Sequence, residues 1–300
     1  MSLVLKTNCL TKKFGKQIAV NEVNMNIEKG DIYGFIGKNG AGKTTLMKMV
    51  CGLISKSKGE IKLFESNDVE KERKRIGCVI EEPAIYEGMT ARQNLIYYNK
   101  LLGIPDNSNI EPLLKSVGLG DTGKKKAKQF SLGMKQRLSI AVALLGNPDF
   151  LILDEPINGL DPSGIREIRE LIIKLNVENK ITVLISSHIL GEISKIATKY
   201  GIVDKGVLVD EFTAEELKNR CKRCLPIKTK DVEKAAYIIK NNIKSEDFEV
   251  LDSGEICVYD LLDKSAEINV ELIKNNIIVT SISTKDKDAE EYFVKMMGGN

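Results

Sequence analysis

The feature that most constrains the fold of this 300-residue chain is a glycine-rich segment, Gly37-Lys38-Asn39-Gly40-Ala41-Gly42-Lys43-Thr44. It has the spacing G-x-x-x-x-G-K-[ST] and lies between an apolar run at 32–36 and a segment of helical periodicity at 45–50. In that setting, backbone N–H groups of the loop and the N-terminus of the helix surround phosphate groups. We expect Lys43 to reach the β and γ phosphates of a nucleotide, and the Thr44 hydroxyl to bind Mg²⁺. The loop residues, together with Thr45, are therefore predicted to bind nucleotide in an α/β fold, rather than to form a merely flexible loop.

Two acidic residues follow an apolar strand farther along the chain. The run Phe150-Leu151-Ile152-Leu153 ends in Asp154 and Glu155, which a buried strand tolerates only at its exposed carboxyl end. Together with the upstream phosphate loop, this predicts that Asp154 holds Mg²⁺ through water and that Glu155 is the general base or the polariser of the attacking water. His188 follows another apolar run, 181–185, at the sheet edge where α/β proteins bind ligands. A lone histidine is often an incidental residue, but this position makes His188 a candidate catalytic residue beside Lys43 and Glu155.

Apolar periodicity predicts how the rest of the chain is organised. Segments 4–9 and 23–27 alternate apolar and polar residues, which indicates an antiparallel edge near the N-terminus. The region at about 82–145 has mostly helical spacing. The fully apolar runs described above are typical of a parallel sheet that is covered on both faces. A composition change near Arg220 predicts a domain boundary that divides the chain into residues 1–220 and 221–300.

Residues 221–300 carry no phosphate motif and have a pattern of their own. The pentapeptide Ile239-Lys240-Asn241-Asn242-Ile243 recurs as Ile273-Lys274-Asn275-Asn276-Ile277, each time between a predicted helix and a strand. Asn is common in left-handed caps at helix C-termini, so the recurrence also fits two independent caps. The expected order is strand, helix, strand, strand, helix, strand, which is the split βαβ or ferredoxin-like arrangement, at 225–228, 232–241, 248–251, 255–259, 266–275 and 277–283.

Composition and charge exclude several classes of protein. No run approaches the roughly 18 apolar residues that a membrane-spanning helix needs, and the N-terminus has too little apolar sequence for a signal peptide. We therefore expect a cytoplasmic protein. The formal net charge is only +3, which does not favour a basic nucleic-acid-binding surface. The one basic run, Lys124-Lys125-Lys126, is either a solvated loop or a segment close to anionic lipid headgroups.

The six cysteines are expected to be free thiols in a reducing compartment. Cys221 and Cys224 form a C-x-x-C pair, but a structural zinc site requires four ligands. Because the only histidine, His188, lies in another segment, the sequence does not favour zinc.

A further motif separates one family of phosphate-loop proteins from the others. The segment Phe130-Ser131-Leu132-Gly133-Met134, followed by Gln136-Arg137, places a hydroxyl and backbone N–H groups at a helix start, where they can bind phosphate. It resembles the Leu-Ser-Gly-Gly-Gln signature of the ATP-binding cassette (ABC) family, with matches at Ser131 and Gly133 and departures at the other three positions. The phosphate loop, this signature, the Asp154-Glu155 strand end, the segment Gly159-Leu160-Asp161 and His188 follow one another in the family's order. The resemblance covers roughly residues 3–216.

The resemblance implies a P-loop NTPase cassette with a RecA-like core, an antiparallel β edge and a helical subdomain, and it implies ATP and Mg²⁺ as ligands. ABC subunits close head to tail as dimers, so Ser131 and Gly133 of one copy would cap ATP on the phosphate loop of a second copy. Phe14 matches the family's aromatic position that stacks on adenine, although a phenylalanine on a strand could equally belong to the core. A separate membrane permease is the expected partner, nucleic acid is not, and the chain would lie peripherally on the inner face of the membrane.

One position departs from the family pattern in an informative way. Where the family has a glutamine, this chain has Glu81, followed by Glu82-Pro83-Ala84. A carboxylate can still hold Mg²⁺ through an oxygen, but it adds negative charge beside the phosphates. This departure and the altered signature resemble the peptide-antibiotic transporters, such as those that give bacitracin resistance or lantibiotic self-protection. We therefore expect an ATP-hydrolysing transporter subunit that powers export of a peptide antibiotic or similar amphiphile.

Two alternatives stay open at this point. The first is a soluble ABC ATPase of repair or translation, although such proteins carry long coiled coils or two cassettes in tandem, and this chain has one phosphate loop and no sustained heptads. The second is an ATP-gated switch with little turnover, which the altered signature and Glu81 make conceivable.

Overall fold

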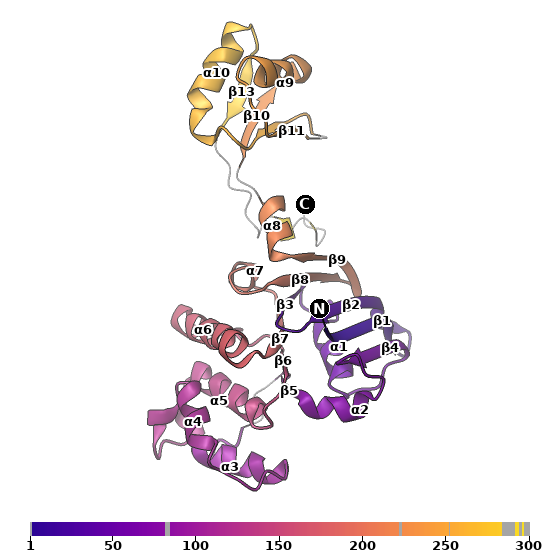
Figure 1. Ribbon diagram of the computed structural model, residues 1–300, viewed down its shortest axis with the longest axis vertical. Coiled ribbons are helices and arrows are strands. Elements are labelled where there is room, and N and C mark those ends of the chain that lie inside the picture. The colour runs from indigo at the N-terminus through magenta and orange to yellow at the C-terminus, as the bar shows by residue number, and fades with distance from the viewer. Residues whose placement is uncertain are drawn as a thin grey trace. The chain divides into compact units, whose positions relative to one another are not determined.

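The chain folds into two compact units, built on Met1–Ala214 and on Glu215–Lys295. The computed structural model describes residues 2–81, 85–221, 224–251, 253–283, 292–293 and 296 (Figure 1). The division falls at the start of helix α8, Ala214–Arg220, and the boundary expected near Arg220 lies at the other end of the same helix. No helix in the described ranges is long and apolar enough to cross a membrane.

A six-stranded sheet is the centre of the first unit. Its spatial order is β5-β6-β7-β3-β8-β9, and all pairs are parallel except β8 with β9. Residues of β3, β6 and β7 are buried throughout, as expected for strands covered on both faces. Helix α6 lies on one side of this sheet and α1 on the other (Figure 1). The six strands are β3 Ile32–Ile36, β5 Ile76–Val79, β6 Phe150–Leu153, β7 Thr182–Ser187, β8 Lys199–Asp204 and β9 Val207–Thr213.

The predicted antiparallel strands near the N-terminus form a second, separate sheet. Strand β1, Leu3–Phe14, lies between β2, Gln17–Glu28, and β4, Lys58–Leu63. Its buried face joins one core cluster with α1, Lys43–Val50, and with side chains of the central sheet such as Phe150. The helix that follows the phosphate loop is thus packed between two sheets. Neither β4 nor β5 was predicted as a strand from the sequence.

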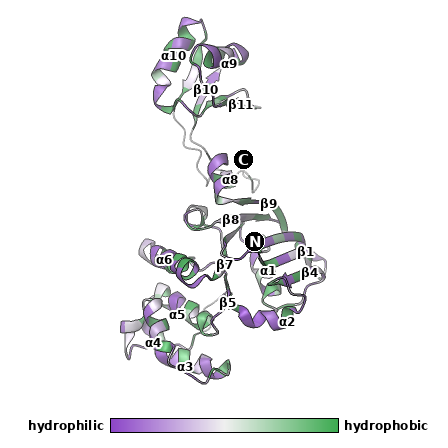
Figure 2. Ribbon diagram, viewed as in Figure 1, coloured by the Kyte–Doolittle hydropathy of each residue, from purple (hydrophilic) through white to green (hydrophobic). Residues whose placement is uncertain are grey.

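Helices occupy much of the region at 82–145, as predicted. They are α3 Ala91–Leu101, α4 Ile110–Ser116 and α5 Leu132–Leu144. Thr90 and Gln93 form a capping box at the start of α3, which satisfies backbone donors that the first turn leaves unpaired. Helix α6, Pro162–Asn179, packs on the central sheet. Both hydrophobic and hydrophilic residues occur along it (Figure 2). Short helices complete this unit at α2 Val69–Glu72, α7 Leu190–Ile193 and the 3₁₀ turns Arg73–Arg75, Gly120–Thr122 and Ala127–Gln129.

The second unit has the predicted split βαβ order. Its four strands lie in the order β11-β12-β10-β13, and every neighbouring pair is antiparallel, which is the ferredoxin-like topology. Ile239 and other side chains of the two helices pack with sheet residues such as Leu225 into a core of their own. The elements are β10 Leu225–Thr229, α9 Val232–Asn241, β11 Phe248–Val250, β12 Ile256–Val258, the 3₁₀ turn Leu262–Lys264, α10 Ser265–Lys274 and β13 Val279–Ile282.

The repeated pentapeptide ends both helices of this unit with the same backbone hydrogen bond. Ile243 N–H donates to the Ile238 carbonyl, and Ile277 N–H donates to the Leu272 carbonyl at the equivalent place. The repeat is not exact in conformation, because Asn276 has a φ of 59° whereas Asn242 has a φ of −92°. The recurrence therefore reflects a shared way of ending a helix and entering a strand.

Candidate functional site

The glycine-rich segment connects β3 to α1 and is held by close backbone packing. Gly42 has a φ of 106°, and a Cβ atom placed on it would lie 2.4 Å from the Ala19 carbonyl oxygen of β2. A Cβ atom on Gly37 would lie 2.4 Å from the Val203 carbonyl oxygen of β8. Only glycine fits at these two positions, because one requires a left-handed conformation and both lie against backbone. The loop is therefore a fixed cradle and not a flexible link.

Lys43, the first residue of α1, points back into this cradle. Its side chain is only 5% exposed, and Nζ donates hydrogen bonds to the carbonyls of Gly37, at 2.6 Å, and Lys38, at 3.2 Å. The same Nζ lies 3.1 Å from Glu155 Oε1 as an ion pair that lacks hydrogen-bond alignment. The ammonium group that is predicted to bind phosphates thus lies between the loop and the acidic end of β6.

Thr44 and Asp154 meet beside Lys43. The Thr44 hydroxyl donates to Asp154 Oδ2 at 2.7 Å, and the Ser186 hydroxyl of β7 donates to Asp154 Oδ1 at 2.6 Å. One hydroxyl and one carboxylate are the hard oxygen donors that suit Mg²⁺, which takes few protein ligands and completes its octahedron with water and phosphate oxygens. No group of three or more His, Cys, Asp or Glu side chains in the described part of the chain forms a metal site by itself. This donor set fits a magnesium ion held jointly by protein and nucleotide.

Glu155, which follows Asp154 at the end of β6, contacts the histidine that follows β7. Its Oε2 lies 2.7 Å from His188 Nδ1, and its backbone N–H donates to Ser186 Oγ at 2.9 Å. Glu155 has a φ of 49°, a conformation that costs free energy for a non-glycine residue and is common at functional sites. Lys43, Glu155 and His188, predicted from three distant segments, therefore form one continuous chain of charged and hydrogen-bonding groups.

Ser186 is the site residue that sequence reasoning did not assign. It accepts a hydrogen bond from the Glu155 backbone and donates one to Asp154, so it fixes both acidic residues. The available signal was its place at the carboxyl end of an apolar strand, next to the sheet edge where ligands bind.

Glu81 lies at the end of β5 and pairs with a residue of α1. Its carboxylate Oε1 accepts a hydrogen bond from Lys48 Nζ, and its side chain is 62% exposed. Glu81 also has a positive φ of 62°. This ion pair attaches the end of β5 to the helix that carries Lys43 and Thr44. The Glu82-Pro83-Ala84 run lies outside the described residues.

The signature segment forms the exposed start of helix α5. Ser131 is its N-cap, with Oγ accepting a hydrogen bond from Met134 N–H at 3.3 Å. Leu132 is 47% exposed, and a Cβ atom on Gly159 would lie 3.3 Å from it, so the signature packs beside the Gly159-Leu160-Asp161 segment. Asp161 in turn caps α6 by accepting from Gly164 N–H at 3.1 Å. These features present a helix N-terminus and a serine to the outside of the subunit.

Phe14 lies at the end of β1 and is 51% exposed. The core alternative is therefore wrong for this residue. Lys12 Nζ lies 4.9 Å from the centre of the Phe14 ring, so a cation–π contact helps to position the ring.

The remaining sequence features have plain structural outcomes. The run Lys124-Lys125-Lys126 is exposed, as a solvated loop is. All six cysteines lie among the described residues, and no disulfide joins them.

The model of the ABC transporter family matches residues 20–158 of this chain. The bacitracin transport ATP-binding protein BcrA of Bacillus licheniformis is 43% identical over 302 aligned residues, which cover 100% of this chain and 99% of that protein. The lantibiotic transport ATP-binding protein SrtF of Streptococcus pyogenes is 47% identical over 209 residues, or 69% of this chain and 90% of that protein.

The solved structures that resemble this chain are also ABC cassettes. A nucleotide-free ATP-binding cassette from an ABC transporter superposes with a TM-score of 0.64 at 25% identity, over 72% of this chain and 94% of that one. A dimeric cassette in a post-hydrolysis state, bound to ADP and phosphate, gives a TM-score of 0.62 at 26% identity over 70% of this chain and 98% of that one. The alignment with the bacitracin relative extends over all the segments that carry the cradle around Lys43, the Thr44–Asp154 pair and the Glu155–His188 pair. The chain belongs to the ABC transporter family and is one of its ATP-hydrolysing, ATP-binding subunits.

Proposed function

We propose that this subunit powers a separate membrane permease that removes a peptide antibiotic or a similar amphiphile. Relatives that match almost the full chain are named for bacitracin transport, and a relative of the first unit is named for lantibiotic transport. A match that extends through the second unit supports transport over the alternatives of a repair or translation ATPase. The observation that carries the catalytic part is the contact of Glu155 with both Lys43 and His188.

The phosphate cradle and the Thr44–Asp154 pair would bind Mg-ATP. Lys43 would exchange its loop carbonyls and Glu155 for the β and γ phosphate oxygens, while loop N–H groups of residues 37–45 hold the phosphate chain. When bound, Mg²⁺ supplies positive charge that offsets the charge developing on the transferred phosphoryl group. Thr44 and Asp154 would hold the ion, with Ser186 keeping Asp154 oriented. Glu81 is a further candidate ligand only after it leaves Lys48.

Glu155 would accept the proton of the attacking water. His188 Nδ1, at 2.7 Å from the Glu155 carboxylate, keeps that carboxylate in one orientation. A general base must lie within hydrogen-bond reach of the water it activates, and fixing its side chain lowers the cost of reaching that geometry.

A head-to-tail homodimer would complete the site. Ser131 and Gly133 lie at the exposed start of α5 and would bind the nucleotide of a second subunit, while Phe14 would stack on its own subunit's adenine. Residues 1–220 would form this cassette, with 82–145 as its helical subdomain, and 221–300 would be an accessory domain. The assembly would lie on the cytoplasmic face of the membrane, attached through the permease.

The test asks whether a membrane permease and a peptide change the rate of ATP hydrolysis by this subunit. The tagged full-length chain is purified from detergent-solubilised membranes together with its permease, and ATPase activity is measured in proteoliposomes with and without bacitracin as the probe peptide. We expect the permease to raise the rate several-fold, the peptide to change it further, and Lys43→Ala to abolish it. A rate that neither permease nor peptide changes would refute transport of peptides while leaving the ATPase intact.

A further inference from the structure

Lys48 lies on α1 one helical turn after Thr44, whose hydroxyl pairs with Asp154. Residues four apart on a helix are neighbours on one face, with Cβ atoms about 5–6 Å apart. The Lys48 side chain therefore leaves α1 on the same face as a candidate Mg²⁺ ligand. Its Nζ donates a hydrogen bond to Glu81 Oε1 and forms an ion pair with that carboxylate. Lys48 thus holds a carboxylate on the face of α1 that carries Thr44.

The end of β5 brings Glu81 to the edge of the central sheet where Asp154 lies. Strands β5 and β6 are parallel, and Val79 pairs with Leu153 at their carboxyl ends. The Asp154 N–H donates to the Val79 carbonyl at 2.9 Å, so the pairing continues one residue past β6. Glu81 follows Val79 by two residues. The Glu81 carboxylate therefore belongs to the sheet edge that carries the candidate magnesium site.

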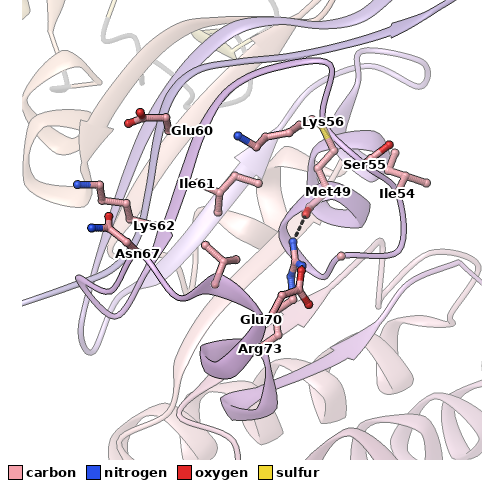
Figure 3. A pocket seen from close by; sticks show the side chains of 12 residues that line it. Met49, Ile54, Ser55, Lys56, Glu60, Ile61, Lys62, Asn67, Glu70 and Arg73 are labelled. Atoms are coloured by element: carbon pink, nitrogen blue, oxygen red, sulfur yellow. Dashed lines mark hydrogen bonds and ion pairs between the residues drawn. The ribbon is translucent and has the colours of Figure 1, made fainter.

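The two ends of β5 are attached to α1 with different strength. Before β5, Arg73 donates from Nε to the Val50 carbonyl at 3.1 Å and from Nη2 to the Met49 carbonyl at 3.2 Å, next to a hollow of about 770 Å³ that Arg73 and Met49 line (Figure 3). After β5, the attachment is the ion pair of Lys48 with Glu81, whose side chain is 62% exposed. Exposed ion pairs are weak because water and salt screen them, and the Glu81 φ of 62° costs further free energy. The end of β5 that carries Glu81 is therefore the one that can change partner.

We propose that Lys48 is a positioning residue that competes with Mg²⁺ for the Glu81 carboxylate, and that it thereby sets the Mg²⁺ concentration at which the subunit binds ATP. This role rests on the magnesium site proposed at Thr44 and Asp154. Without nucleotide, the Lys48 ammonium group holds Glu81. With Mg-ATP bound, Glu81 exchanges a single positive charge for a divalent one, and carboxylate oxygens are preferred ligands of Mg²⁺. Because Glu81 must first leave Lys48, the subunit binds the metal more weakly than it would without the lysine.

The first test measures metal dependence without relying on turnover. ATP binding to the full-length chain is measured by calorimetry at a series of free Mg²⁺ concentrations, in a Glu155→Gln background that slows hydrolysis. Lys48→Met keeps the aliphatic part of the side chain and removes its charge, so it releases Glu81. We expect the free Mg²⁺ concentration for the half-maximal gain in ATP affinity to fall about two- to fivefold, which is the usual strength of an exposed ion pair. Lys48→Arg can still pair with Glu81 and should leave the Mg²⁺ dependence close to that of the parent protein.

A second set of variants tests whether Lys48 acts through Glu81. In the Glu81→Gln protein Lys48 has no carboxylate to hold at this position, so the addition of Lys48→Met should hardly shift the Mg²⁺ dependence. Arg92→Gln is the matched control, because it breaks the exposed ion pair of Arg92 with Glu111 and should leave the Mg²⁺ dependence unchanged. All variants should unfold at nearly the same urea concentration, because neither ion pair is buried.

The outcomes separate the role of Lys48 from the proposed metal site. An equal shift by Lys48→Met with and without Glu81→Gln would overturn the role of Lys48, since it would show that the lysine only repels the ion through space. The absence of a shift in both backgrounds would overturn it as well. Either result leaves the magnesium site intact, because ATP binding still depends on Mg²⁺. ATP binding that is independent of Mg²⁺ in every variant would instead refute the proposed magnesium site, and the role of Lys48 with it.

Discussion

Replacement of Glu155 by Gln separates two effects of one carboxylate. Glu155 lies 3.1 Å from Lys43 Nζ and 2.7 Å from His188 Nδ1, so it is both a candidate base and a competitor of phosphate for the lysine. Gln keeps the shape and one acceptor oxygen but loses the charge and the ability to take a proton. We expect Glu155→Gln to hydrolyse ATP about 10²–10⁴-fold more slowly, which is the usual contribution of a general base. We also expect it to bind ATP more tightly.

The gain in affinity can be worked from the ion pair. At 3.1 Å and an effective dielectric constant of about 20, the attraction between two unit charges is about 5 kcal/mol. Forming the pair removes hydration from both charges, and this cost offsets most of the attraction, which leaves about 1–2 kcal/mol for the ionic contact. Releasing Lys43 from this contact should therefore lower the dissociation constant for ATP about 5–30-fold. Removing a negative charge beside the phosphates acts in the same direction.

Two measurements on one preparation test this reasoning. Phosphate release gives the turnover rate, and calorimetric titration gives the affinity for Mg-ATP. Gel filtration at saturating Mg-ATP should also show a trapped dimer. Glu111→Gln is the matched control, because that exposed carboxylate pairs with Arg92 on the helical part of the first unit. An unchanged affinity would refute competition for Lys43, and a rate above one tenth of the native value would refute the role of Glu155 as base.

Three further outcomes follow from the structure. Gly37→Ala places a methyl group 2.4 Å from the Val203 carbonyl, so it should displace the loop and weaken ATP binding at least tenfold by calorimetry, and an unchanged affinity would mean that the cradle tolerates the shift. Phe150→Ala removes a fully buried ring of the central sheet and should lower the free energy of unfolding by about 3–5 kcal/mol in urea denaturation, whereas a change below about 1 kcal/mol would contradict the close packing of that strand. Glu81→Gln should raise the Mg²⁺ concentration for half-maximal ATPase activity a few-fold, because it removes a charge that attracts the metal, and superimposable titrations would show that this side chain does not reach the ion.

Local patterns in the sequence were sufficient for much of the fold. The glycine spacing before Lys43 fixes a strand, loop and helix, because backbone that wraps phosphates needs left-handed turns and no side chains. Asp154 and Glu155 could be assigned from the apolar strand before them, because such a strand admits acids only at its exposed end. The whole order of the second unit was predicted correctly, since its short elements are separated by clear turns and its helices end on the same pentapeptide.

Contacts between distant segments were decided only by the tertiary structure. The order of the central sheet brings Ser186 against both acids, and no periodicity in the sequence encodes which parallel strands become neighbours. Strand β5 is a short edge strand that includes Gly77, so its local signal was weak, yet its position determines where Glu81 and Cys78 lie. The Lys48–Glu81 pair depends on that position. Residue types and their spacing thus fixed the chemistry available to this chain, while the packing of α1 against two sheets decided which of those groups touch, because long-range contacts depend on how all the elements close around a shared core.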